Sequence, residues 1–84
     1  MIRVLFFASI RERMGRSELM LEFDASCATI ESLVRRLEQR ELPGCAAVLL
    51  AENSLLAINR NIVSLRQPIA DGDEVAFYPP VTGG

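Results

Sequence analysis

Histidine is absent from this chain of 84 residues, and all nine basic residues are arginine, so lysine is absent as well. The lack of histidine removes the usual general base, the Ser-His-Asp triads and most transition-metal sites. The lack of lysine excludes Schiff-base chemistry and a P-loop. The side chains therefore lack most of the catalytic groups that an enzyme acting alone would use.

Cysteine is scarce: Cys27 and Cys45 stand too far apart for a C-x-x-C motif, and two cysteines do not make a zinc site. We expect two half-buried free thiols and no bound metal. The alternative, a persulfide-carrying cysteine, has no local sequence feature in its favour.

A net charge of −2 and a pI near 5.0 give no electrostatic reason to bind nucleic acid or an anionic membrane. The apolar run from Val4 to Ile10 is too short to span a bilayer and lacks a signal-peptide cleavage pattern. We therefore expect a cytoplasmic protein. Its length and its 50% hydrophobic content fit one small domain with a single core.

The first half of the chain predicts two strands and a helix. Residues 2–8 predict a strand with Ile2, Val4, Phe6 and Ala8 on one side. Ser9-Ile10-Arg11-Glu12 has the form of a capping box, and Gly15 suits a left-handed C-cap, so one or two helical turns are expected between them. Residues 17–23 predict a half-buried strand, paired with the first as a hairpin, with Leu19, Leu21 and Phe23 inward.

The main helix is expected to begin after Thr29 and to end at Pro43-Gly44. Four apolar residues follow the i, i+3, i+4, i+7 spacing of an amphipathic helix, namely Ile30, Leu33, Val34 and Leu37. Arg35, Arg36 and Arg40 are expected on its solvated face. The segment 45–51 fits helix or strand equally well.

The second half predicts strands over 55–58, 62–65 and 74–78. Asn59-Arg60-Asn61 predicts a tight turn that tolerates left-handed backbone, and Asp71-Gly72-Asp73 predicts another. The acidic group Asp71, Asp73 and Glu74 is interpreted as a turn before a strand rather than as a cation site. The element order predicts an α+β fold, a ubiquitin-like β-grasp whose mixed sheet is covered on one face by one main helix.

The chain ends in Pro79-Pro80-Val81-Thr82-Gly83-Gly84. We expect a β-grasp domain over residues 1–78 and an extended tail over residues 79–84. Proline favours a stiff, extended exit, and glycine without a Cβ passes through a channel too narrow for any side chain. The reactive group of such a tail is the Gly84 carboxylate.

The chain resembles the small subunit of molybdopterin synthase, a family of ubiquitin-like sulfur carriers in molybdenum-cofactor biosynthesis. The matching segments are Val4-Leu5-Phe6-Phe7-Ala8, Arg11-Glu12 with Gly15, Asn59, and the run from Asp71 to Gly84. The resemblance implies that a ubiquitin-activating-like enzyme adenylates Gly84 and that a sulfur donor then converts it to a thiocarboxylate. It also implies that Pro80, Val81, Thr82 and Gly83 thread into the large catalytic subunit of a heterotetrameric synthase. There the thiocarboxylate gives sulfur to cyclic pyranopterin monophosphate, which forms the molybdopterin dithiolene.

Activation of a carboxylate needs a partner, because this chain has no P-loop, no G-x-G-x-x-G and no lysine for ATP. We therefore expect no bound cofactor and no catalysis by this chain alone, with ATP consumed by the activating enzyme. Both partners need a docking surface, for which the sheet face away from the helix is the candidate. Phe7, Ile62 and Tyr78 are expected there as an exposed partner-binding cluster, unless a loop covers them.

Three other functions are open on the sequence. A thiazole-pathway sulfur carrier uses the same chemistry for another product. A ubiquitin-like protein modifier would join Gly84 to target lysines. The third is a β-grasp interaction domain with an inert tail.

Overall fold

The computed structural model of the chain describes residues 1–80, and its centre is a five-stranded mixed sheet with the strand order β2-β1-β5-β3-β4. The strands are β1 (Ile2–Phe6), β2 (Glu18–Leu21), β3 (Leu55–Ile58), β4 (Asn61–Val63) and β5 (Glu74–Tyr78). The helical elements are α1 (Ala8–Met14), η1 (Ala25–Cys27), α2 (Ile30–Arg36), the π-helical turn η2 (Leu37–Glu41) and α3 (Cys45–Leu49). Val81, Thr82, Gly83 and Gly84 lie outside the described residues.

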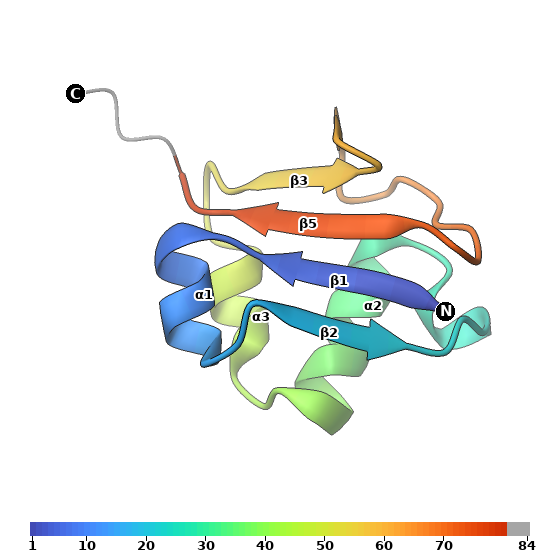
Figure 1. Cartoon of the computed structure of the whole chain (residues 1–84), viewed down its shortest axis with the longest axis horizontal. Coiled ribbons are helices and arrows are strands. Elements are labelled where there is room, and N and C mark those ends of the chain that lie inside the picture. Colours follow the sequence, from blue (N-terminus) through green and yellow to red (C-terminus); the bar gives the residue numbers. More distant parts are fainter. Residues whose placement is uncertain (81–84) are drawn as a thin grey trace.

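The first and last strands of the chain lie side by side in the interior of the sheet and run parallel. β1 pairs with β5 in parallel, and the other neighbouring strands pair antiparallel. In Figure 1, α2 and α3 lie behind the sheet, and α1 lies at the end of the sheet where β1 and β5 both finish. This topology confirms the predicted ubiquitin-like β-grasp.

Three of the four residues predicted on the inward side of the first strand are buried, with Ile2, Val4 and Phe6 each at most 1% exposed. The strand ends at Phe6 rather than at residue 8, and Ala8 is exposed at the start of α1. The predicted capping box is wrong, because α1 begins at Ala8 and Phe7 precedes it without a side-chain cap. Two hydrogen bonds of Phe7 determine where α1 begins. Its N–H still belongs to the sheet and donates to the Phe77 carbonyl (3.2 Å), whereas its carbonyl accepts from the Ile10 N–H (3.1 Å) in the first turn of the helix. Gly15 ends α1 with φ +74°, as predicted.

Strand β2 is shorter than predicted and excludes Phe23, whose side chain is 36% exposed. Leu21 pairs with Ile2, the first residue of β1, so no partner strand continues beyond that pair. Thr29 and Ser32 cap α2 reciprocally, as the Ser32 N–H donates to Thr29 Oγ1 (3.1 Å) and the Thr29 N–H donates to Ser32 Oγ (3.0 Å). The predicted apolar stripe of α2 is confirmed, with Ile30, Leu33, Val34 and Leu37 fully buried.

Arg36 does not belong to a solvated helix face, contrary to expectation, because its side chain is only 11% exposed. Its Nη1 donates to the Glu22 carbonyl (2.8 Å), and the guanidinium pairs with Asp24 (3.5 Å) and Glu41 (3.8 Å). Two of these partners come from the segment between β2 and η1, which packs beside the helix. Helical spacing alone does not reveal such a neighbour.

Residues 45–49, for which the sequence left helix and strand open, form α3. Gly44 precedes it with φ +89°, and the Glu38 carboxylate accepts hydrogen bonds from the backbone N–H of Gly44 and of Ala46 (2.9 Å). Glu38 therefore satisfies backbone donors at the start of α3 that have no partner within the helix.

The turn between β3 and β4 and the turn before β5 both form as predicted. Strand β4, however, ends at Val63 rather than at residue 65. Asn59 (φ +49°) and Arg60 (φ +71°) form a two-residue hairpin turn of the I′ kind. Left-handed backbone suits asparagine, but it costs an ordinary residue such as arginine roughly 1–2 kcal/mol.

The acidic group before β5 is a turn, as interpreted. Asp73 accepts hydrogen bonds from Asn59 Nδ2 (3.0 Å) and from the Ala70 N–H (2.8 Å), and Asp71 pairs with the amino group of Met1 (2.5 Å). Within residues 1–80, no three metal-binding side chains gather into a possible cation site.

We expect Glu38→Ala to lower the melting temperature at pH 7 by several degrees, because the start of α3 loses its cap. The N–H donors of Gly44 and Ala46 hold the pKa of Glu38 below its ordinary value of 4.5. Their contribution is therefore present above that value and is lost as the pH falls through the lower pKa of the folded protein. Thermal unfolding at several pH values should show the difference from wild type shrinking below about pH 4. Glu12→Ala, on the exposed side of α1, is the control, and an unchanged difference at pH 3 would contradict the assignment.

Candidate functional site

The tail leaves the domain from an interior strand of the sheet rather than from an edge. β5 lies between β1 and β3 and ends at Tyr78, followed by half-buried Pro79 and exposed Pro80. Figure 1 shows this end of β5 between the end of β1 and the start of β3. The residues that follow β5 therefore leave the sheet between β1 and β3. The predicted tail residues Val81 to Gly84 lie outside the described part.

Phe7 and Tyr78 stack directly at the base of the tail. Their ring centroids are 4.7 Å apart and their planes differ by 3°, and Phe7 is 36% exposed. On the other side of Tyr78, Leu55 is its register partner in β3. The three side chains form a row across the end of the sheet, on the face opposite the helices.

Ile62, the third predicted partner-binding residue, lies on the same face but in the next row. It is 63% exposed and pairs with Ala57, which pairs with Ala76, which in turn pairs with Leu5. The structure thus brings Phe7 and Tyr78 into contact and places Ile62 on the edge strand of the same surface. No loop buries Phe7 or Ile62. We call the seven residues of these two rows the docking surface: Leu5, Phe7, Leu55, Ala57, Ile62, Ala76 and Tyr78. Ala57 and Ala76 are themselves buried, so the other five form its exposed part.

Four members of the docking surface were not among the predicted site residues. Strand alternation alone places Leu5 beside Phe7 and Ala76 beside Tyr78, so the signal for these two was present in the sequence. Leu55 and Ala57 could be added only once the register between β3 and β5 was known.

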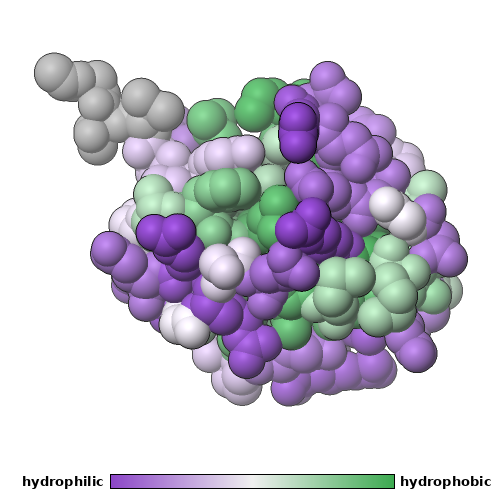
Figure 2. Space-filling model, in the orientation of Figure 1, coloured by the Kyte–Doolittle hydropathy of each residue, from purple (hydrophilic) through white to green (hydrophobic). Residues whose placement is uncertain are grey.

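The outer face of the sheet is divided between apolar and charged residues. At the end away from the tail, Arg3 donates to Glu18 (2.9 and 3.1 Å) and lies 3.6 Å from Glu74. Figure 2, seen from this face, shows one group of hydrophobic residues on the side of the tail and a second group on the opposite side, with hydrophilic residues between them. The apolar part is suited to desolvation by a partner, and the paired charges border it.

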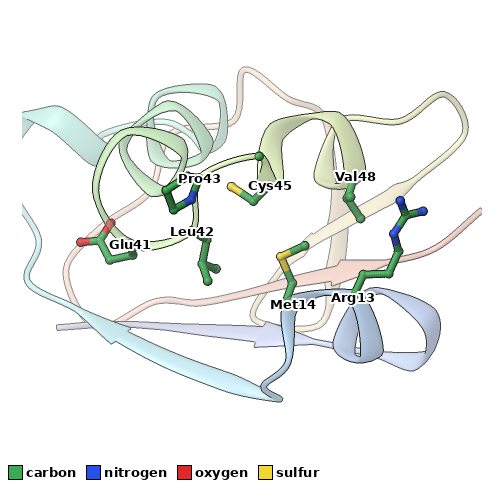
Figure 3. A pocket seen from close by; sticks show the side chains of 8 residues that line it. Arg13, Met14, Glu41, Leu42, Pro43, Cys45 and Val48 are labelled. Atoms are coloured by element: carbon green, nitrogen blue, oxygen red, sulfur yellow. The ribbon is translucent and has the colours of Figure 1, made fainter.

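A groove of about 340 Å³ lies between α1 and α3, on another part of the molecule (Figure 3). Met14, Leu42, Cys45 and Val48 line it together with Arg13. Cys45 is 1% exposed, and burial raises the pKa of its thiol to about 11. Cys27 is also completely buried, so both thiols are more enclosed than the half-buried state that was predicted. Neither is placed to exchange sulfur with a partner.

No helix of the described part is long and apolar enough to cross a membrane. The described residues thus give a β-grasp domain with an apolar sheet face at the base of its C-terminal tail. This arrangement is that of a ubiquitin-like β-grasp protein.

The model of the ThiS family matches residues 4–84, and the chain belongs to this family. It is 44% identical to the molybdopterin synthase sulfur carrier subunit of Escherichia coli, with both chains covered completely. It is 32% identical to small archaeal modifier protein 3 of Haloferax volcanii, over 99% of this chain and 98% of that protein.

Among solved structures, it is similar to the protein–protein complex of subunits 1 and 2 of the molybdopterin-converting factor from Helicobacter pylori. The matched chain of that complex has a TM-score of 0.63 and 21% identity, over 99% of this chain and 97% of that one. At this identity the likeness concerns the fold.

We expect Cys27 and Cys45 to react with a disulfide reagent at least tenfold more slowly in the folded protein than in guanidinium chloride, because attack requires an exposed thiolate. At pH 8, a thiol with a pKa of about 11 is ionised in roughly one molecule in a thousand. Absorbance of the released thiol, followed in native and unfolded protein, measures both rates. Rapid labelling of either cysteine in the native state would reopen the persulfide alternative.

Proposed function

We propose that this chain is the sulfur carrier subunit of a molybdopterin synthase and that it carries sulfur as a thiocarboxylate at Gly84. The observation that carries the proposal is the full-length 44% identity to the Escherichia coli sulfur carrier subunit. The Gly-Gly ending supports it, because only a tail without side chains fits a narrow active-site channel.

The chemistry follows from the properties of a backbone carboxylate. With a reference pKa of about 3.3–3.7, the Gly84 carboxyl is an anion at neutral pH, and it repels nucleophiles and offers no leaving group. Reaction with ATP forms the C-terminal acyl-adenylate and releases pyrophosphate. Attack by a donor persulfide (R–S–S⁻) then breaks the acyl–phosphate bond, releases AMP and leaves an acyl disulfide. A second thiol of the donor attacks the S–S bond, which releases the Gly84 thiocarboxylate and leaves the donor as a disulfide.

The ATP must be bound elsewhere, because the sequence contains no nucleotide-binding motif and no lysine. We therefore propose a ubiquitin-activating-like adenylating enzyme as one partner. The other is the large subunit of the synthase, which receives the tail Pro80-Val81-Thr82-Gly83-Gly84 and supplies the acid, base and substrate-binding groups. The substrate there is cyclic pyranopterin monophosphate, and this chain acts as a co-substrate.

The docking surface serves both partners in turn. The stacked rings of Phe7 and Tyr78 offer a large apolar area next to the tail, and Ile62 extends it to the sheet edge. Burial of exposed apolar area contributes favourably at roughly 25 cal/mol per Å², from which the costs of association and side-chain ordering are subtracted. The Helicobacter pylori complex, in which subunit 1 is assembled with subunit 2, supports an assembly of this kind.

A second function is favoured by one specific observation, the 32% identity to an archaeal modifier protein over nearly the whole chain. In that case the activated Gly84 forms an isopeptide with lysines of target proteins. Immunoblots of cell lysates separate the two functions: a ladder of higher-mass conjugates indicates a modifier, and a lone carrier band indicates sulfur transfer. Loss of thiamine synthesis rather than of molybdenum-enzyme activity in a deletion strain would instead indicate a thiazole-pathway carrier.

We expect intact mass spectrometry to show replacement of one C-terminal oxygen by sulfur after incubation with the activating enzyme, ATP and a sulfur source. The reaction needs the terminal acyl group, so a variant without Gly84 should stay unmodified and should not restore molybdenum-enzyme activity in a deletion strain. The double variant Cys27→Ala, Cys45→Ala is the matched control and should still gain sulfur. Full activity of the variant without Gly84 would refute the proposed carrier role.

We expect Phe7→Arg and Tyr78→Arg each to abolish measurable binding to the large subunit, since each places a charge in the apolar interface. Both positions are partly exposed, so the circular-dichroism spectrum and cooperative unfolding should be retained. Isothermal titration calorimetry measures the affinity. Met20→Arg, at an exposed position at the opposite corner of the same face, is the control and should bind as wild type. Unchanged affinity of both arginine variants would remove the docking surface from the mechanism.

A further inference from the structure

The turn between β3 and β4 contains a residue that the fold does not favour. Turns of the I′ kind need positive φ at both central positions, and glycine is the usual residue at the second. Arg60 occupies that second position with φ +71°. Its side chain is exposed, and no hydrogen bond or ion pair of Arg60 within the domain accompanies this strained backbone.

The nearby carboxylates are already engaged by other groups. Asp73, at the turn before β5, accepts hydrogen bonds from Asn59 and from the Ala70 N–H. Glu74 lies 3.6 Å from a guanidinium nitrogen of Arg3. The backbone of the turn is held to β5 independently of Arg60, because the Glu74 N–H donates to Asn59 Oδ1 (3.0 Å). Folding therefore gains nothing evident from an arginine at this position.

Arg60 stands two residues before Ile62, which at 63% has the highest exposure among the large hydrophobic side chains of the described part. Both belong to one hairpin at the β4 edge of the sheet, where the docking surface ends. A residue that strains the backbone and brings the fold no compensating contact is typical of a functional position. A cation at the border of an apolar surface is a common interface feature, since charged residues lie at the rim and accelerate association with a complementary partner.

We propose that Arg60 is a partner-recognition residue, and that it pairs with an aspartate or glutamate of the large subunit when that subunit covers the docking surface. The inference rests on the proposed function and extends its interface to the β3–β4 turn. It assigns to the turn a specificity role separate from the apolar contacts of Phe7 and Tyr78, because an ion pair at the rim selects a partner by charge.

The test compares three variants with wild type in binding to the large subunit by calorimetry and stopped-flow at two salt concentrations. Arg60→Gly relieves the strained backbone and removes the charge, so its melting temperature should rise by a few degrees while its affinity falls roughly three- to fivefold at low salt. Its association rate should also depend less on salt. Arg60→Lys keeps the charge and should bind within about twofold of wild type. Arg66→Gln, which removes another exposed arginine, should leave the affinity unchanged.

The outcomes separate this inference from the function on which it rests. Wild-type affinity and salt dependence in Arg60→Gly, or an equal loss in Arg66→Gln, would overturn the role of Arg60 while leaving the docking surface intact. Tyr78→Arg serves as the reference in the same experiment. Tight binding by Tyr78→Arg, or no binding by the wild type, would overturn the proposed docking and the role of Arg60 with it.

Discussion

The parallel pairing of β1 with β5 is the constraint on which the rest of the structure depends. It joins the first and last strands at the centre of the sheet, with Val4 opposite Val75 and Phe6 opposite Phe77 on the buried face. The rings of Phe6 and Phe77 stack in the core with centroids 6.0 Å apart. Because both strands run the same way, their ends coincide, so the residue that leaves β1 and the residue that leads into the tail lie side by side.

The same register also places two aromatic side chains in contact on the outer face of the sheet. One residue beyond the buried pair, Phe7 and Tyr78 project from the opposite face and stack at 4.7 Å. A partner that covers these rings is necessarily placed at the base of the tail. Core residues and residues of the docking surface thus alternate along β1 and β5, and this explains how a chain of 84 residues fits both in so few elements.

The proposed division of labour between this chain and its partners agrees with the side chains that the chain lacks. Both thiols are buried, no histidine or lysine is present, and the three metal-binding side chains needed for a cation site do not come together among residues 1–80. The proposed chemistry accordingly resides in the terminal acyl group and in the partners. In this proposal the domain contributes position and recognition, through the apolar rows of the sheet and the charge of Arg60 at their border.

The sequence by itself determined the order and approximate positions of the strands, the capped α2 with its buried stripe, the glycine turns and the alternation that exposes Phe7 and Tyr78, because these depend on local spacing and backbone preference. It misjudged Arg36, the start of α1 and the ends of β1, β2 and β4, and it left residues 45–51 open. Only the tertiary structure decided these, since they depend on contacts between distant segments: the Glu22 carbonyl and Asp24 around Arg36, and the Phe77 carbonyl that holds Phe7. Register across β5 likewise decided that Leu55 and Ala57 join the docking surface, because periodicity within one strand fixes which side a residue faces but not which residue lies beside it.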